Sequence, residues 1–246
     1  MQEVLEQEVT KTDIIAVRYR KQQLAIFKGL LESPDFFNEK KSEWNKRRDE
    51  DVWQHFFETN QWIFGHGLNY LCLSSLNEKK LEQIVSGYDF SSSGKRVDAL
   101  MKTRGLISSL CFVEIKTHQT PLLSEERDPY RSESWAISRQ LAGSHAQIQR
   151  TVQEAVQSIG TRVRLTDRIG DPTTEEFFLY RPKSYLIVGS LAEFRSEHGV
   201  NEHKYSSFEM WRQDLKSTEV ITFDELHERA SSIINTPHKM AAERAA

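Results

Sequence analysis

The sequence is poor in cysteine, with only Cys72 and Cys111 among its 246 residues. Two cysteines so far apart exclude a disulfide framework and a cysteine-based metal site, so we expect both to be small buried residues. No apolar run approaches the ~20 residues of a membrane-spanning helix. The first residues are acidic and polar, which argues against a secretory signal. We therefore expect a cytoplasmic protein without a membrane partner.

A basic excess is also missing, because the formal net charge is −3. Nucleic-acid-binding proteins usually carry such an excess, so any nucleic-acid surface here has to be a local patch. The sequence contains no internal repeat and no low-complexity segment. Its length suits one sizeable α/β domain, or such a domain with a small helical appendage.

Apolar spacing predicts two helices in the first quarter of the chain, over residues 12–32 and 39–59. Ser33-Pro34 ends the first helix, and packing or contact between subunits is its simplest role. The second helix begins with a very polar half and ends with an aromatic stripe. Glu58 lies beside that stripe. By spacing alone, Glu58 is most simply a solvated residue on the helix flank.

The middle of the chain predicts strands joined by short turns, typical of an antiparallel meander. The expected strands are residues 69–73, 81–90, 98–101 and 110–116. A long irregular loop follows over 117–134. The second half then alternates helices with buried strands, which favours parallel neighbours. Its expected elements are a helix at 135–159, a loop at 160–176, strands at 184–189 and 219–223, a short helix at 208–215, and a last helix that begins with a capping box of Thr222 and Glu225.

These elements predict a mixed α/β fold in three parts. Residues 1–38 form an N-terminal helical segment, residues 39–235 the α/β domain, and residues 236–246 a frayed tail.

The residues that can carry chemistry lie at the ends of two of these strands. Side chains two apart in a strand share a face, so Glu114 and Lys116 point the same way. If the strands are neighbours, Asp98 meets them at one sheet end. Asp98, Glu114 and the carbonyl of Ile115 then offer hard oxygen ligands for Mg²⁺. Lys116 can orient or deprotonate a water, or hold a phosphate, which suits phosphodiester hydrolysis. The simpler alternative is a surface ion pair of Glu114 and Lys116.

Several motifs in a fixed order resemble the PD-(D/E)xK nuclease superfamily and, more narrowly, Shedu-type bacterial anti-phage nucleases. The resemblance covers roughly residues 40–234. It rests on the runs Trp53 to Gly65, Val97-Asp98-Ala99-Leu100, Phe112 to Lys116, Gln140 to Ile148, and Glu219 to Leu226. One departure is Val97, which stands where the family motif has a proline. Because proline is not a ligand, the chemistry is unaffected.

The resemblance implies a restriction-endonuclease-like fold with Asp98, Glu114 and Lys116 as the catalytic set. It implies that Glu58 and Gln147 support them from two helices. It further implies Mg²⁺ or Mn²⁺ as the cofactor, DNA as the substrate, and a homo-oligomer, either a dimer or a tetramer. The N-terminal sensing region usual in such proteins is expected to be short or absent.

The remaining basic and histidine residues admit a functional and a simpler interpretation. Sequence-independent contacts to DNA phosphates can come from Lys40, Lys41, Lys46, Arg47, Arg48, from His118, and from Arg162, Arg164 and Arg168. The simpler interpretations are that the basic residues between 40 and 48 form a solvated helix face and that His118 is a loop histidine. The arginines between 162 and 168 would then simply belong to a polar loop. His66, His118 and His145 lack zinc-ligand spacing, and His145 fits the apolar stripe of its helix.

Two other function classes stay open at this point. One is a catalytically silent nucleic-acid sensor that keeps the fold, and the other is a plain oligomerisation module.

Overall fold

A computed structural model describes residues 11–64, 73–75, 99–103, 109–126, 128–166 and 171–242. Several residues singled out in the sequence lie outside this description, namely Asp98, Val97, Cys72, His66 and Arg168. The predicted strand at 81–90 and nearly all of the one at 69–73 lie outside it as well.

The centre of the protein is a mixed five-stranded sheet in the order β1-β2-β3-β6-β9. Its strands are β1 (Leu73–Ser75), β2 (Ala99–Thr103), β3 (Leu110–Ile115), β6 (Ser184–Ile187) and β9 (Thr218–Ile221). Strands β1, β2 and β3 pair antiparallel, whereas β3, β6 and β9 pair parallel. Both predicted pairing modes and the α/β class are therefore confirmed for the described strands.

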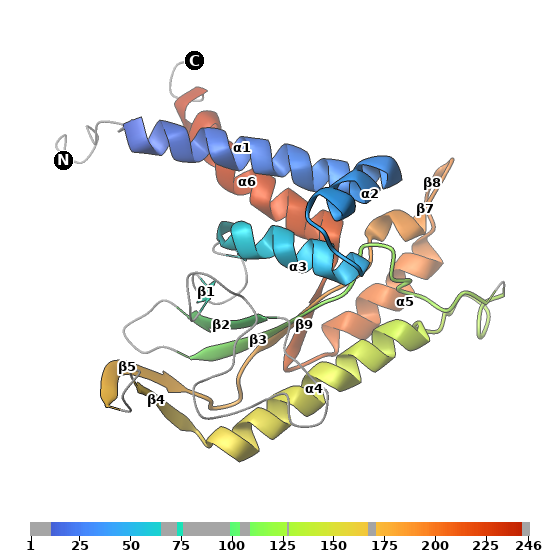
Figure 1. The fold of residues 1–246 in the computed structure, drawn as a ribbon. Helices are drawn as coiled ribbons and strands as arrows, with labels where there is room; N and C mark the ends of the chain where they lie inside the picture. Colours follow the sequence, from blue (N-terminus) through green and yellow to red (C-terminus); the bar gives the residue numbers. More distant parts are fainter. Residues whose placement is uncertain are drawn as a thin grey trace.

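Helices cover both faces of this sheet (Figure 1). On one side lie α1 (Lys11–Glu32), α3 (Asp49–Thr59) and α6 (Phe223–Ala242), and on the other lie α4 (Arg139–Ile159) and α5 (Glu202–Gln213). Strand β3 contributes to both layers, since Cys111, Val113 and Ile115 join the core beneath α1, α3 and α6. Phe112 points the other way and packs in the cluster that contains Ile148 of α4. The predicted alternation of faces along β3 is thus confirmed.

The predicted helix over residues 39–59 is wrong, because the chain forms two helices there. Helix α2 (Pro34–Glu43) begins after the N-cap Ser33, and α3 begins only at Asp49. Between them Asn45 adopts a left-handed conformation with φ of 51°, which asparagine tolerates better than most residues. The carboxylate of Asp51 then accepts a hydrogen bond from the Arg48 amide at 3.2 Å and caps the new helix.

The predicted loop at 160–176 is also wrong in part. After α4 the chain forms the antiparallel hairpin of β4 (Arg162–Thr166) and β5 (Pro172–Phe178). The capping box before α6 is confirmed, with the Thr222 amide donating to Glu225 Oε2 at 3.0 Å. Helix α6 extends past Thr236 to Ala242, and the fraying expected from Thr236 stays a prediction. The short elements η1 (Gln61–Phe64), η2 (Leu191–Phe194), β7 (Arg195–Ser196) and β8 (Gly199–Val200) complete the description.

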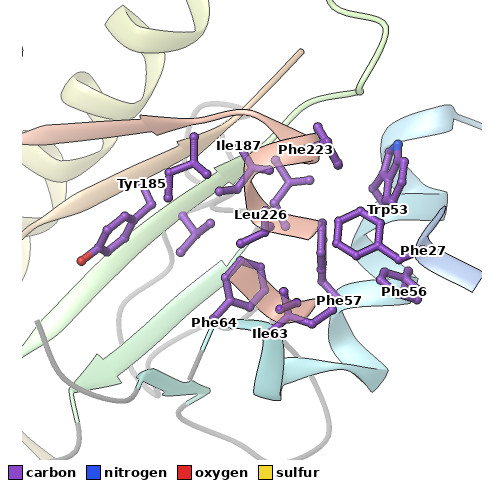
Figure 2. Packing of buried hydrophobic residues seen from close by; sticks show 14 of the residues in the cluster. Phe27, Trp53, Phe56, Phe57, Ile63, Phe64, Tyr185, Ile187, Phe223 and Leu226 are labelled. Carbon is purple, nitrogen blue, oxygen red and sulfur yellow. The ribbon is translucent and has the colours of Figure 1, made fainter. Parts of the chain in front are cut away.

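The largest core is aromatic and lies between the sheet and the helices of one face (Figure 2). Phe27 of α1, Phe57 of α3 and Phe223 of α6 are all fully buried in it. Helix α1, which lies in the N-terminal helical segment predicted at 1–38, therefore packs into this core. Toward its start α1 instead exposes Ile14 and Ile15. Among the described helices, none is both long and apolar enough to cross a membrane.

Gly189, just after β6, fixes the loop that follows β3. Its φ is 63°, and its amide donates to the Thr117 carbonyl at 3.0 Å. A Cβ at this position would lie 2.5 Å from Leu122 Cδ2 and 2.8 Å from the Thr120 carbonyl oxygen. The backbone conformation and the close approach both require glycine here.

We therefore predict that Gly189→Ala lowers the free energy of unfolding by about 2–4 kcal/mol, from backbone strain and overpacking together. Urea denaturation followed by circular dichroism measures this. Gly143→Ala is the control, because a Cβ there meets nothing within 4 Å and alanine stabilises a helix interior by roughly 0.5–1 kcal/mol over glycine. Equal stability of the two variants would contradict the role given to Gly189.

Candidate active site at the end of strand β3

Glu114 and Lys116 lie at the carboxyl end of β3, where the strand leaves the sheet. The Lys116 Nζ atom is 2.7 Å from Glu114 Oε1, and the Glu114 residue is only 3% exposed. A buried carboxylate is costly unless it is paired, so this ion pair differs from an exposed surface pair. The simpler interpretation of Glu114 and Lys116 as a solvated pair is therefore wrong.

Gln147 of α4 completes this pair from the other layer. Its Nε2 donates to Glu114 Oε1 at 2.8 Å, and its Oε1 accepts from Lys116 Nζ at 3.5 Å. Helix α4 is held in place at its start, because Ser138 Oγ accepts from the Leu141 amide and donates to the Pro121 carbonyl. Three of the predicted site residues, Glu114, Lys116 and Gln147, are thus brought together.

The structure adds a carboxylate that the sequence did not single out. Glu50, in the first turn of α3, has Oε1 3.9 Å from Lys116 Nζ, and its side chain is 37% exposed. It lies three residues before Trp53, and therefore on the side of the helix that carries the aromatic stripe. This spacing from Trp53 could have identified Glu50 in the sequence. Because one continuous helix was predicted from residue 39, Glu50 was not expected to lie in the first turn of a helix.

Glu58 lies eight residues after Glu50 on the same helix, about 12 Å further along its axis. Its carbonyl accepts a hydrogen bond from Gln61 Nε2 at 3.3 Å. The α3 carboxylate that approaches Lys116 at the N-terminal end of the helix is therefore Glu50, and a supporting role for Glu58 stays a prediction from the resemblance.

We predict that Glu50→Gln lowers the DNA cleavage rate proposed below by about 10- to 100-fold, as expected for a group that orients a reactive side chain. Glu58→Gln, the matched change on the same helix, is expected to have a much smaller effect because of its distance from Lys116. Single-turnover rates of the two variants measure the difference. A larger loss for Glu58→Gln would reverse this assignment.

Burial raises the pKa of the Glu114 carboxyl, and the Lys116 ammonium opposes that rise. The negative charge of Glu50 raises the pKa of Glu114 further. A cation placed between two neighbouring carboxylates favours their charged forms. In this structure the Lys116 ammonium has that position.

The carboxylates of Glu114 and Glu50 and the backbone carbonyl of Ile115 are the kinds of oxygen donor that suit Mg²⁺. This ion typically takes only one or two protein carboxylates and keeps waters or phosphates as its other ligands. The described part of the chain contains no group of three or more His, Cys, Asp or Glu side chains placed to hold a metal. Asp98 lies outside the described residues, but it directly precedes Ala99, which pairs with Val113 beside Glu114.

Four of the nine predicted phosphate-contacting residues are paired with nearby acids. Lys40 contacts Glu43 at 2.5 Å, Lys41 contacts Asp49 at 2.6 Å, and Arg48 contacts Asp51 at 2.5 Å. On the β4–β5 hairpin, Arg162 pairs with Glu176. Among the set around the α2–α3 connection, Arg47 is exposed and Lys46 is half-buried.

Two of the three histidines raised by the sequence, His118 and His145, lie within the described residues and have packing positions. His118 accepts a hydrogen bond from Trp53 Nε1 at 3.1 Å and packs against aromatic rings. His145 packs edge-on against Trp211, in agreement with its predicted place on the apolar stripe. Cys111 is buried as expected, and burial raises the pKa of its thiol to about 12.

Comparison with known proteins gives the family. The family model described as "Shedu protein SduA, C-terminal" matches residues 47–227, a span that contains Glu50, Glu114, Lys116 and Gln147. The chain belongs to this family.

The "Shedu protein SduA" of Bacillus cereus (strain B4264) is 30% identical over 189 residues. The match covers 75% of this chain and 45% of that relative. The chain thus spans about half the length of the curated relative, and the Shedu family resemblance expected from the motifs is confirmed.

Proposed function

We propose that this chain is a metal-dependent endonuclease that hydrolyses phosphodiester bonds in DNA and acts in bacterial defence against phage. The observation that carries the proposal is the buried Glu114 carboxylate, 2.7 Å from Lys116 Nζ and 2.8 Å from Gln147 Nε2. Membership of the Shedu SduA family supports the defence role. The mixed sheet with helices on both faces is compatible with a restriction-endonuclease-like, PD-(D/E)xK fold, which is part of the proposal.

In this proposal the metal ligands are Glu114, Asp98 and the carbonyl of Ile115, and Glu50 adds negative charge from α3. When bound, Mg²⁺ or Mn²⁺ lowers the pKa of a water and neutralises charge that develops on the phosphate. Both carboxylates next to Lys116 are hard oxygen donors, which these ions prefer.

Lys116 has two tasks in the proposed reaction. Its ammonium, held by Glu114 and within 3.9 Å of Glu50, supplies positive charge for the phosphate oxygens. As an ammonium, Nζ can also orient the attacking water by donating a hydrogen bond to it, and only in its neutral amine form could Nζ accept the proton of that water. Gln147 contacts both Glu114 and Lys116, and so fixes the positions of these two side chains relative to each other.

The DNA backbone would be held near the start of α3, where Lys46 and Arg47 precede Glu50. Each phosphate contact adds about 0.9 to the slope of log affinity against log salt. We expect a Lys46→Ser, Arg47→Ser double variant to lower that slope by about 2. Fluorescence anisotropy with a labelled duplex measures it. Lys28→Ser is the control, because Lys28 is an exposed lysine of α1 that pairs with Glu32. An unchanged slope in the double variant would contradict phosphate contacts by Lys46 and Arg47.

The test of the proposed function is incubation of the purified chain with circular and linear DNA, with Mg²⁺ or with EDTA. Loss of intact DNA only in the presence of Mg²⁺ is the expected result. Binding without any loss of DNA would instead favour a catalytically silent nucleic-acid sensor. No binding even at low salt, where phosphate contacts are strongest, would favour an oligomerisation module.

A further inference from the structure

We propose that His118 is a positioning residue that fixes the first turn of α3 against the end of β3, so that Glu50 faces Lys116. This inference rests on the proposed function, because it gives His118 its role in the same site. It replaces the expectation that His118 contacts a phosphate.

The hydrogen bond between Trp53 and His118 joins the two elements directly. Trp53 Nε1 donates to His118 Nδ1 at 3.1 Å across 65 positions of sequence. His118 follows Lys116 by two residues, and Trp53 follows Glu50 by three, one turn along the helix. Glu50 Oε1 is also 3.9 Å from Lys116 Nζ. The start of α3 and the segment after β3 are therefore joined at two points, by Trp53 with His118 and by Glu50 with Lys116.

The His118 ring is held in place from several sides. Its centroid lies 5.4 Å from Phe37, 5.3 Å from Trp53 and 6.2 Å from Phe223, so α2, α3 and α6 all contact it. The backbone around it is fixed as well, because the Thr120 amide donates to the Thr117 carbonyl at 3.2 Å. A residue packed this tightly has little freedom to approach DNA, but it is well placed to transmit the position of α3.

The protonation state agrees with an acceptor role for Nδ1. Burial lowers the pKa of His118 to about 4, although the charge of Asp49 opposes that shift. At neutral pH the ring is therefore uncharged, and Nδ1 can accept the indole proton. Trp53 is fully buried, so its Nε1–H would be left without a partner if the acceptor were removed.

Two substitutions separate this positioning role from simple packing. His118→Phe keeps an aromatic ring but removes the acceptor, and we expect kcat to fall by about 10- to 100-fold with little change in KM. His118→Asn loses the ring but keeps an acceptor on Cγ, and we expect it to restore most of the rate. His55→Phe is the control, because His55 lies on the same helix but packs against Trp44.

A second measurement does not depend on catalysis. Amide hydrogen exchange of residues 52–56, the first amides of α3 with acceptors inside the helix, should be faster in His118→Phe than in the wild type, and unchanged in His118→Asn and in His55→Phe. The indole Nε1–H resonance of Trp53 should shift only in His118→Phe. Trp53→Phe removes the donor instead, and its effect should not add to that of His118→Phe.

The inference is overturned if His118→Phe leaves both kcat and the exchange of residues 52–56 at wild-type values, or if His118→Asn is as impaired as His118→Phe. Failure of the proposed function has a different signature, because the wild type then cuts no DNA. The exchange and resonance measurements still decide whether His118 holds α3 in that case.

Discussion

Replacement of Lys116 by alanine is expected to lower the rate of DNA cleavage by about 10²- to 10⁴-fold, the range that a positioned acid–base group contributes. The side chain is only 18% exposed, and its ammonium is the cation between the carboxylates of Glu114 and Glu50. Its loss removes the positive charge for the phosphate and the group that orients water. Single-turnover cleavage of a plasmid at saturating Mg²⁺ measures the effect.

The fold should survive this change, because Lys116 lies just beyond the last residue of β3 and outside the apolar clusters. Gln147 still donates to Glu114 in the variant and limits the cost of burying that carboxylate. Circular dichroism and the melting temperature check this. Lys28→Ala is the matched control, because its side chain is 61% exposed and pairs with the similarly exposed Glu32 of the same helix. A variant at position 116 that has lost its fold would make the rate uninformative, and Lys116→Met then serves as the apolar substitute of similar length.

The second large effect is on stability, at Phe57. This residue is fully buried, with ring centroids 5.0 Å from Phe64, 5.9 Å from Trp53 and 6.1 Å from Phe223. Figure 2 shows it among side chains from α1, α3, η1 and α6, which all meet at this point. We expect Phe57→Ala to lower the free energy of unfolding by about 3–5 kcal/mol, from lost burial and from the cavity left behind.

Urea denaturation compared with Tyr180→Ala tests this. Tyr180 is 70% exposed, so its truncation should change stability by no more than about 0.5 kcal/mol. A loss of the same size in both variants would mean that the aromatic cluster does not hold α3 to the sheet. In that case the cluster would not fix the positions of Glu50 and Trp53 either.

The strand end was predictable because strand geometry is simple. A period of two fixes that Glu114 and Lys116 share a face and that Val113 and Ile115 face the core. Gln147 could be identified only from the order of the motifs, because the local sequence of α4 does not show which of its residues contacts β3. The residue types alone leave Gln140 and Gln147 equivalent, and the packing of α4 on the sheet decides between them.

Glu50 was not predicted, for a physical reason that the α2–α3 connection makes clear. The charged run before Trp53 is dominated by glutamate, lysine and arginine, which are good helix formers, so the sequence predicts one continuous helix in spite of Asn45. The break depends on a left-handed Asn45 and on the cap that Asp51 gives to Arg48. Both are stabilised by the packing of α2 and α3 around Phe37 and Trp53, which is information from the tertiary structure.

The hairpin at 162–178 was missed for a similar reason. Strand β4 does alternate polar and apolar residues, but over only five positions, and β5 has paired glutamates and phenylalanines without alternation, so the hairpin as a whole carries a weak pattern. The pairing of Arg162 with Phe178 and of Arg164 with Glu176 becomes visible only when the strands are side by side.

The most direct test of a metal site at Glu114 is a Mg²⁺ titration of plasmid cleavage for the wild type and for Glu114→Gln. Gln147 and Lys116 can still contact the amide, so the variant changes mainly the charge of the ligand. The account predicts a cleavage rate that rises with Mg²⁺ and saturates in the wild type, and a rate at least about 10³-fold lower in Glu114→Gln, equivalent to about 4 kcal/mol of lost charge stabilisation. Cleavage by Glu114→Gln at the wild-type rate, or cleavage by the wild type in EDTA, would contradict it.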